Sequence, residues 1–193
     1  MSTVRPAAVA GTFYPADPAV LLAEVNELLD GVDTFDVRFG HPKVLIVPHA
    51  GYVYSGQTAA HAYNELASAR GVVKRVVLLG PVHRVAVRGL ALPGVDEFAT
   101  PLGRVPVDAE AVRAVSRLPQ VVTSAPAHAR GHSLDVQLPF LQRVLGSCSL
   151  LPLAGGLRSM GRFWFKSCPW VGMAAMAHPA SAFCAEHACA LQL

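Results

Sequence analysis

Three histidines in this sequence have the surroundings of a metal site. His49 directly follows the apolar run 43–48, and His83 closely follows a second apolar run, 75–80. A transition-metal site needs neutral imidazoles held on rigid neighbouring elements, and the ends of parallel strands supply such rigidity. We therefore predict His49 and His83 as metal ligands; a loop histidine bonded to backbone is the plain alternative for each. His132 is a third candidate, either as a ligand or as an acid/base or substrate-positioning group.

Two tyrosines close to the first histidine form a candidate ligand pocket. Tyr52 and Tyr54 could each donate a hydrogen bond to an oxygen atom of a bound molecule. Gly51 would let the backbone approach that molecule, although a tight turn before a helix explains the same residues. His61 lies in a helical pattern and His128 in an expected loop, so both are weaker candidates for the site.

A carboxylate would complete this set, because two histidines and one carboxylate with open positions form the site of non-haem iron(II) oxygenases. The sequence does not identify one. Asp96, Glu97 and Asp135 occur where acidic side chains are mostly solvated or cap helices. The chain has no phosphate-binding glycine loop, no Gly-x-Ser-x-Gly elbow and no Rossmann glycine motif, which argues against nucleotide hydrolysis and serine hydrolysis.

The elements expected to hold these side chains alternate between strands and helices, which is typical of an α/β fold. Apolar runs bounded by turn residues predict strands at 43–48, 75–80, 87–92, 120–123 and 149–153. Residues 98–103 are expected to form a loop. The first two strands, joined by a helix, would be neighbours in a βαβ unit. Both histidines would then leave one edge of the sheet, where open α/β sheets bind their ligands.

Helical spacing of apolar residues predicts helices at 18–30, 55–70, 109–118 and 133–142. Asp17, Ser55 and Asp108 are expected to cap the first three at their N-termini, and Gly71 to end the second. Pro139 must sit in the first turn of the last helix or kink it.

Composition limits the classes of function. The 193 residues carry 16 Lys and Arg against 13 Asp and Glu, and these charges are scattered, which argues against nucleic acid as a partner. An apolar fraction of 52% is enough for a core, yet no apolar run approaches the roughly 20 residues of a membrane helix. Without a recognisable secretory signal, a cytoplasmic protein is expected. The cysteines contain no Cys-x-x-Cys pair and fit neither a disulfide framework nor a zinc module.

The amino-acid composition and the hydrophobic pattern of the sequence change near residue 156. Both tryptophans, three of the four methionines and three of the four cysteines lie beyond Leu157, without a sustained helical or strand pattern. This segment is either an apolar cover for the core or a frame-shifted end, and we favour the second because local pattern and global fold agree in evolved sequences. The expected organisation is an α/β domain over 1–155, incomplete at its C-terminal end, and an atypical tail over 156–193.

Five motifs follow one another along the first 155 residues. They are Arg-Pro-Ala-Ala-Val-Ala-Gly-Thr-Phe-Tyr-Pro at 5–15, Val-Pro-His-Ala-Gly-Tyr-Val-Tyr-Ser-Gly at 47–56, Leu-Gly-Pro-Val-His at 79–83, Thr-Pro-Leu-Gly at 100–103 and His-Ser-Leu-Asp-Val-Gln-Leu-Pro-Phe-Leu at 132–141. Together they resemble the Memo family, whose bacterial members are called AmmeMemoRadiSam system protein B. The resemblance implies a fold similar to class III extradiol dioxygenases, with a mainly parallel central sheet, helices on both faces and a metal pocket at the strand ends.

The resemblance also implies functional roles. His49 and His83 match the metal-binding histidines of the family, which implies iron(II) or another divalent or copper ion, and His132 matches a further pocket histidine. The implied function is metal-dependent redox or oxygenase chemistry on a small molecule, or recognition of a peptide, since the animal member is known to bind a phosphotyrosine peptide. The bacterial family name implies partners from a radical-SAM-associated system, and neither nucleic acid nor a membrane is expected.

Two departures from the family pattern affect the site. Gly131 precedes His132 where the family usually has Glu, so a pocket carboxylate is absent. The family also continues into a Ser-Asp-x-x-His motif and a later cysteine that serves as the third metal ligand. Neither is present here, and no role is transferred to Cys168, Cys184 or Cys189. Three functions stand as alternatives: a metal-dependent dioxygenase-like enzyme, a peptide- or anion-binding module, and an inactive truncated product. In the binding module, the histidines, Tyr54 and nearby basic residues such as Arg84 would supply the hydrogen-bond donors.

Overall fold

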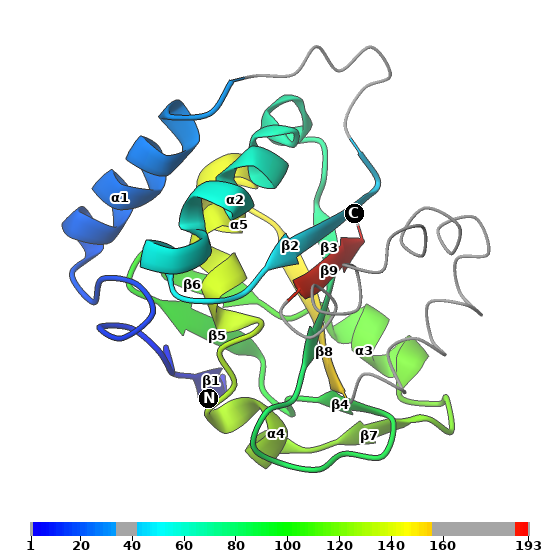
Figure 1. Ribbon diagram of the computed structural model, residues 1–193. Coiled ribbons are helices and arrows are strands. Elements are labelled where there is room, and N and C mark those ends of the chain that lie inside the picture. The colour runs from blue at the N-terminus through cyan, green and yellow to red at the C-terminus, as the bar shows by residue number, and fades with distance from the viewer. Residues whose placement is uncertain (1, 34–41, 156–187, 193) are drawn as a thin grey trace, which may run out of the picture.

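A computed structural model describes residues 2–33, 42–155 and 188–192 of the chain. Its centre is a six-stranded sheet with helices on both faces (Figure 1), which confirms the α/β class. The strands follow one another in the order β2-β9-β3-β8-β4-β7. Their bounds are β2 Val44–Pro48, β3 Arg75–Pro81, β4 Leu90–Leu92, β7 Val121–Thr123, β8 Ser149–Gly155 and β9 Ala188–Gln192.

The sheet is mixed in direction. β3 and β8 run parallel, and so do β4 and β7, whereas β9 is antiparallel to both β2 and β3, and β4 is antiparallel to β8. β2 and β3 therefore point the same way, as a βαβ unit requires. They are not neighbours, however, because β9 lies between them. This corrects the expectation of two neighbouring histidine-bearing strands. β9 comes from the segment 156–193, most of which lies outside the described residues, so the proposed boundary near residue 155 stays a prediction.

Helices cover both faces of the sheet (Figure 1). α1 (Pro18–Asp30), α2 (Tyr52–Asn64) and α5 (Leu138–Leu145) pack together over the larger core, and α3 (Ala109–Val115) packs on the opposite face. Alternate residues of β3 point to the two sides. Val76 and Leu78 belong to the larger core, and Val77 and Leu79 to the smaller core beside α3. A strand buried on both faces reads as a continuous apolar run, which is why the sequence predicts it.

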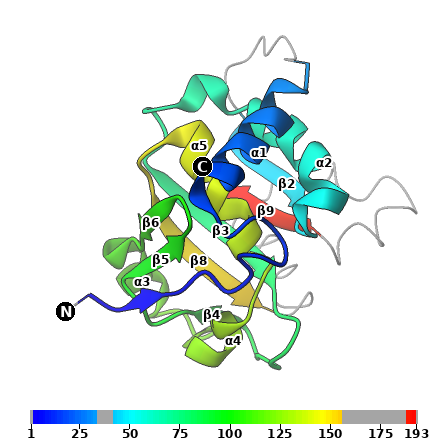
Figure 2. The same ribbon diagram turned by 90° about the vertical axis from the view of Figure 1, so that its left-hand side faces the viewer.

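A second sheet of three strands lies beside the first (Figure 2). β1 (Val4–Arg5) pairs parallel with β5 (Glu97–Thr100), which pairs antiparallel with β6 (Gly103–Pro106). The prediction of a loop over 98–103 is therefore wrong, because most of this segment belongs to a β-hairpin. Its turn is held by Thr100, whose hydroxyl accepts a bond from the Leu102 N–H and donates one to Gln142 on α5.

The observed helix ends agree only in part with those predicted from the sequence. Asp17 and Asp108 cap α1 and α3 by accepting backbone N–H bonds in the first turn, as predicted. Ser55 does not cap α2, which begins three residues earlier, after Gly51, and ends at Asn64, well before the predicted stop. A 3₁₀ turn at 135–137 precedes α5, and Pro139 lies in the first turn of that helix, where its missing N–H costs no hydrogen bond.

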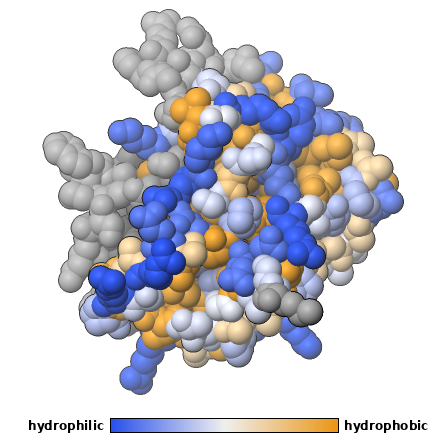
Figure 3. All heavy atoms as spheres, turned by 180° about the vertical axis from the view of Figure 1, so that it is seen from behind, coloured by the Kyte–Doolittle hydropathy of each residue, from blue (hydrophilic) through white to orange (hydrophobic). Residues whose placement is uncertain are grey.

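Large apolar side chains also reach the surface. Seen from the side opposite to Figure 1, hydrophobic patches lie among hydrophilic side chains (Figure 3). Val53 and Tyr54, in the first turn of α2, are the most exposed large apolar residues of the described chain, at 84% and 85%. None of the described helices has the length and hydropathy needed to cross a membrane.

Candidate metal centre

Three histidines from three separate segments meet at one end of the sheet. His49 follows β2, His83 follows β3, and His132 lies in the connection that leads to α5. The ring centroids are 5.3 Å apart for His49 and His83, 5.6 Å for His49 and His132, and 4.3 Å for His83 and His132. One ligand nitrogen from each ring lies within 4.8 Å of the other two. The structure thus brings together the three histidines that the sequence singles out.

The cluster extends from the interior to the surface. His49 is only 1% exposed, His132 is half-buried and His83 is exposed. Phe13 stacks on His132 with ring centroids 4.6 Å apart, and His132 in turn stacks on His83 at an interplanar angle of 22°. The His132 ring is therefore held between two planar neighbours. Within the described part of the chain, this is the only group of three or more metal-ligating side chains with such proximity.

A cavity of about 270 Å³ adjoins the cluster. Its lining consists of Thr12, Phe13, His49, Ala50, Gly51, Tyr54 and His132. Tyr54 thus occupies the predicted pocket. Tyr52 lies elsewhere: its side chain is buried, and its hydroxyl donates a hydrogen bond of 2.8 Å to the Val136 carbonyl. Burial raises the pKa of Tyr52 well above its usual range, so this hydroxyl remains a neutral donor.

Asp135 has a role that the sequence reasoning missed. The sequence predicts a solvated or helix-capping side chain, but this side chain is fully buried and forms an ion pair of 2.7 Å with Arg5. The same carboxylate accepts hydrogen bonds from the Ala8 and Val9 N–H groups and from the Tyr14 hydroxyl. Asp135 is therefore committed to the N-terminal segment and is not part of the histidine group.

Arg5 connects this ion pair to the segment around the third histidine. Its Nε donates to the carbonyl oxygen of His128 and its Nη2 to that of Gly131, each at 2.8 Å. The guanidinium also lies over the ring of Phe98, 4.8 Å from the ring centroid. The residue before His132 is thus anchored through its backbone. A side chain would have room there, since a Cβ on Gly131 would meet no heavy atom nearer than 3.5 Å.

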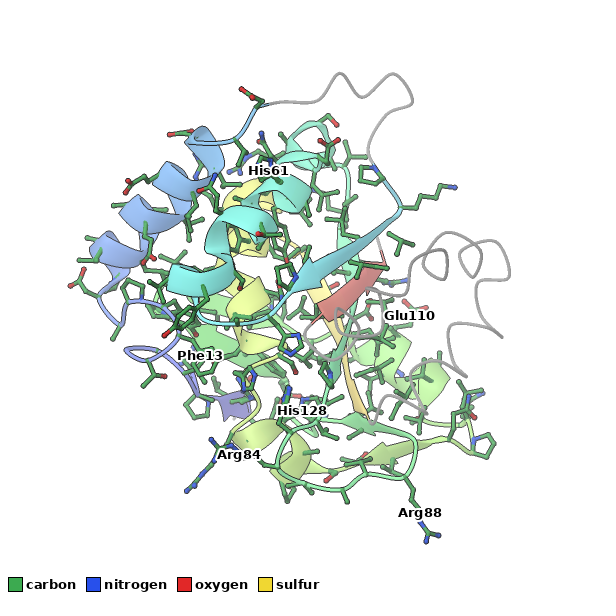
Figure 4. The ribbon with its side chains drawn as sticks, in the orientation of Figure 1. Phe13, His61, Arg84, Arg88, Glu110 and His128 are labelled. Atoms are coloured by element: carbon green, nitrogen blue, oxygen red, sulfur yellow. The ribbon has the colours of Figure 1, made fainter. Side chains whose placement is uncertain are left out.

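The remaining candidates lie away from the cluster. His128 belongs to the short helix α4 (Ala125–Ala129) instead of a loop, and its buried Nε2 is 2.8 Å from the Ala91 carbonyl oxygen. Burial lowers the pKa of His128 to about 4, so the ring is neutral at physiological pH. His61 lies toward the far end of α2, and Arg84 points outward into solvent (Figure 4). Arg84 therefore makes no contribution to the cavity.

Fold and site together define an α/β protein with a candidate histidine metal centre at the carboxyl ends of two parallel strands. Comparison with known proteins gives the family. The family model described as "Memo-like protein" matches residues 5–161. The chain belongs to this family.

Individual relatives come from bacteria, archaea and animals. The chain is 41% identical over 141 residues to a MEMO1 family protein of Aquifex aeolicus, covering 72% of this chain and 50% of that protein. It is 43% identical over 150 residues to a MEMO1 family protein of Methanopyrus kandleri, covering 74% and 52%. It is 37% identical over 146 residues to the Protein memo-1 homolog of Caenorhabditis elegans, covering 74% and 40%. The chain therefore spans about half the length of the curated relatives it matches.

Proposed function

We propose that this chain binds one transition-metal ion through His49, His83 and His132, and that the ion serves redox or oxygenase chemistry on a small molecule in the adjacent cavity. The observation that supports this most directly is the convergence of three imidazoles from three separate segments, with ligand atoms within 4.8 Å of one another. Two nitrogens bonded to one ion at about 2.1 Å lie at most about 4.2 Å apart, so the three rings need only a small side-chain rotation to reach bonding distance.

The donor set limits the choice of metal. Imidazole nitrogens suit iron, copper, nickel and zinc, whereas calcium and magnesium prefer oxygen ligands. Among the described residues no carboxylate joins the group, and the nearby Asp135 is paired with Arg5. The set therefore differs from the site of non-haem iron oxygenases by offering a third imidazole in place of the carboxylate. When bound, iron(II) or copper would supply a redox centre and a Lewis acid with open coordination positions.

The three histidines have different tasks in this proposal. His49 and His83 extend from strand ends and form the rigid pair. His132 completes the set as third ligand, a role that we favour because its ligand atom meets the same distance limit as the other two. Its alternative role is to hold or transfer a proton at a ring nitrogen, for which half-burial beside the cavity is also suitable.

The cavity is open on one side and has room for a small molecule. Its volume of about 270 Å³ is less than twice the roughly 150 Å³ that accommodates benzene in an engineered protein cavity. One substituted ring, or an oxygenated molecule of similar size, would fill it. Phe13 offers an apolar wall, and the exposed Tyr54 adds a hydroxyl group at the rim. A peptide could place one side chain in this space, with the rest of the peptide outside the open side.

Metal titration of single-histidine variants tests the proposal. We expect the metal-free chain to bind about one equivalent of iron(II) under anaerobic conditions, and His49→Ala and His83→Ala to weaken binding by at least about 100-fold, because each loses a direct ligand. His132→Ala should weaken it similarly if this residue is the third ligand, and should leave affinity nearly unchanged if it only transfers protons. His61→Ala is the matched control, since it removes an exposed histidine on α2.

The outcomes separate the three alternative functions. Loss of binding confined to the cluster variants supports a metal centre, and oxygen consumption on adding small aromatic compounds would then identify chemistry. Equal loss in His61→Ala would show unspecific binding. No uptake of iron(II), copper(II) or zinc(II) by the unsubstituted chain would refute the proposal and leave a metal-free binding module or an inactive product.

A further inference from the structure

One short segment of the chain contacts both strand ends that carry metal-site histidines. The segment 132–137 begins with His132 itself. One residue later, the Ser133 hydroxyl donates a hydrogen bond of 2.8 Å to the carbonyl oxygen of Pro81, the last residue of β3. At its other end, the Gln137 Nε2 donates one of 3.0 Å to the carbonyl oxygen of Pro48, the last residue of β2.

These two contacts lie very close to the ligands. Pro48 immediately precedes His49, and Pro81 lies two residues before His83. Both donor side chains are almost fully buried, with Ser133 at 2% and Gln137 at 1% exposure. The Ser133–Pro81 bond is buried and the Gln137–Pro48 bond is part-buried, so water competes little with either bond, and each constrains the backbone that it reaches.

The segment is itself held firmly in place. The Gln137 Oε1 accepts a hydrogen bond of 2.8 Å from the Tyr63 hydroxyl on α2, which orients the amide so that its nitrogen faces Pro48. Between the two contacts, Asp135 is paired with Arg5. These contacts hold the segment in place between its two hydrogen bonds to the strand ends.

The strand order of the sheet explains why these two contacts matter for the spacing of His49 and His83. β2 and β3 do not pair with each other, because β9 lies between them. No direct backbone ladder therefore sets the distance between His49 and His83. β9 connects the two strands by pairing with both, and segment 132–137 adds a second connection, with one side chain on each strand end, as well as the third histidine.

We propose that Ser133 and Gln137 are positioning residues that fix the separation and orientation of His49 and His83 relative to His132. The inference rests on the proposed metal-binding function, and it adds that metal affinity is set in part by two side chains that do not touch the ion. Groups behind the direct ligands that orient them commonly change metal affinity by about 10–100-fold when removed. We expect about 10-fold for either residue.

The chain offers a matched control for Ser133. The Ser149 hydroxyl also donates to a backbone carbonyl beside β3, that of Lys74, at 3.3 Å, but at the opposite end of the strand. Ser133→Ala and Ser149→Ala thus remove the same chemical group from the two ends of one strand. If the Ser133 hydroxyl only satisfies a buried carbonyl, Ser133→Ala lowers stability without changing the positions of the histidine rings.

Gln137→Glu provides a second, nearly isosteric variant. It keeps an acceptor for the Tyr63 hydroxyl and loses the donor to Pro48. Gln142→Glu is its control, because the Gln142 Oε1 accepts a bond from Thr100 on the β5–β6 hairpin, away from the histidines. The full 193-residue chain is used for all four variants, and Ser133→Ala decides the question if Gln137→Glu does not fold.

Two measurements are made on each variant. Long-range ¹H–¹⁵N spectra of the histidine rings are recorded without metal, and cobalt(II) is titrated with its visible absorption bands as the readout. We expect ring signals of His49, His83 and His132 to shift in Ser133→Ala and Gln137→Glu but not in the controls. Cobalt(II) affinity should fall about 10-fold in the same two variants, with altered band intensities.

The results separate this inference from the proposed function. If the unsubstituted chain binds cobalt(II) while Ser133→Ala matches Ser149→Ala in ring spectra and affinity, the inference is wrong and the metal centre stands. If the unsubstituted chain binds no cobalt(II), the metal centre fails. The ring spectra still decide whether Ser133 and Gln137 position the histidines, because they are recorded without metal.

Discussion

Replacement of Asp135 tests whether a buried ion pair holds the N-terminal segment against the histidine site. In Asp135→Asn the side chain keeps its shape, but one carboxylate oxygen becomes an NH₂ group. One oxygen accepts from Arg5, and the other accepts from the Ala8 and Val9 N–H groups and the Tyr14 hydroxyl. Whichever oxygen is replaced, the new NH₂ group therefore faces an N–H or O–H donor of the surrounding protein.

The expected loss is large because neither partner reaches water. Asp135 is 0% and Arg5 is 5% exposed, so the substitution leaves a guanidinium charge buried without its counter-charge. Breaking a buried pair from one side costs about 3–5 kcal/mol. Arg5 retains its bonds to two carbonyl oxygens. We therefore expect the lower end of this range, which is a drop of about 1.5 M in the urea midpoint if the slope is about 2 kcal/mol/M.

Urea unfolding followed by far-ultraviolet circular dichroism measures this loss, and Asp96→Asn is the control. Asp96 also ties the N-terminal strand to the rest of the fold, through the Thr3 N–H and hydroxyl at 2.8 and 2.9 Å, but it is exposed. Water replaces its lost contacts, so the expected cost is below about 1 kcal/mol. Equal losses in the two variants would refute the argument from burial.

Three further predictions concern stability. Between about pH 6.5 and 4 the unfolded chain binds a proton at His128, whereas the folded chain, with a His128 pKa of about 4, does not. Lowering the pH over this range should therefore reduce the free energy of unfolding by up to about 3 kcal/mol. Urea titrations at several pH values should show a weaker pH dependence of this free energy in His128→Gln. Gly89→Ala would place a Cβ 2.0 Å from a backbone carbonyl oxygen at a φ of +94°, and should lower the stability measured by calorimetry by about 3 kcal/mol or more. Gly71→Ala, at a φ of +73° but with open space around the Cβ, should cost only about 1 kcal/mol. Tyr52→Phe removes a buried hydrogen bond and should cost about 1–2 kcal/mol in urea unfolding, whereas Tyr54→Phe, at the exposed rim, should change stability by less than about 0.5 kcal/mol.

The sequence predicted best those features that depend on local pattern. The runs before His49 and His83 are both strands, and the two strands share a direction. β3 is buried on both faces, whereas β2 buries Leu45 and Val47 and leaves Ile46 54% exposed. This is enough to place both histidines at one end of the sheet. The caps at Asp17 and Asp108 are equally local, because each accepts N–H bonds from residues two or three positions further on.

Features that depend on distant partners were missed. Asp135 has the appearance of an ordinary polar residue until Arg5, which is 130 positions away, is placed beside it. The β5–β6 hairpin has local turn bonds through the Thr100 hydroxyl, but its pairing with β1 and its contact with Gln142 on α5 are long-range, and the sequence alone predicts only a loop. The insertion of β9 between β2 and β3 has no local signal either, since it joins residues near 190 to residues near 46 and 78.

The ion pair between Arg5 and Asp135 also has a consequence for synthesis on the ribosome. Arg5 emerges early, but its partner is added 130 residues later, and at about 5–20 residues per second this takes on the order of 10 s. During this interval β1 also waits for β5, which begins more than 90 residues after it. The N-terminal segment, including the Phe13 ring that covers His132, therefore docks late, and contacts of such long range slow the folding of the domain as a whole.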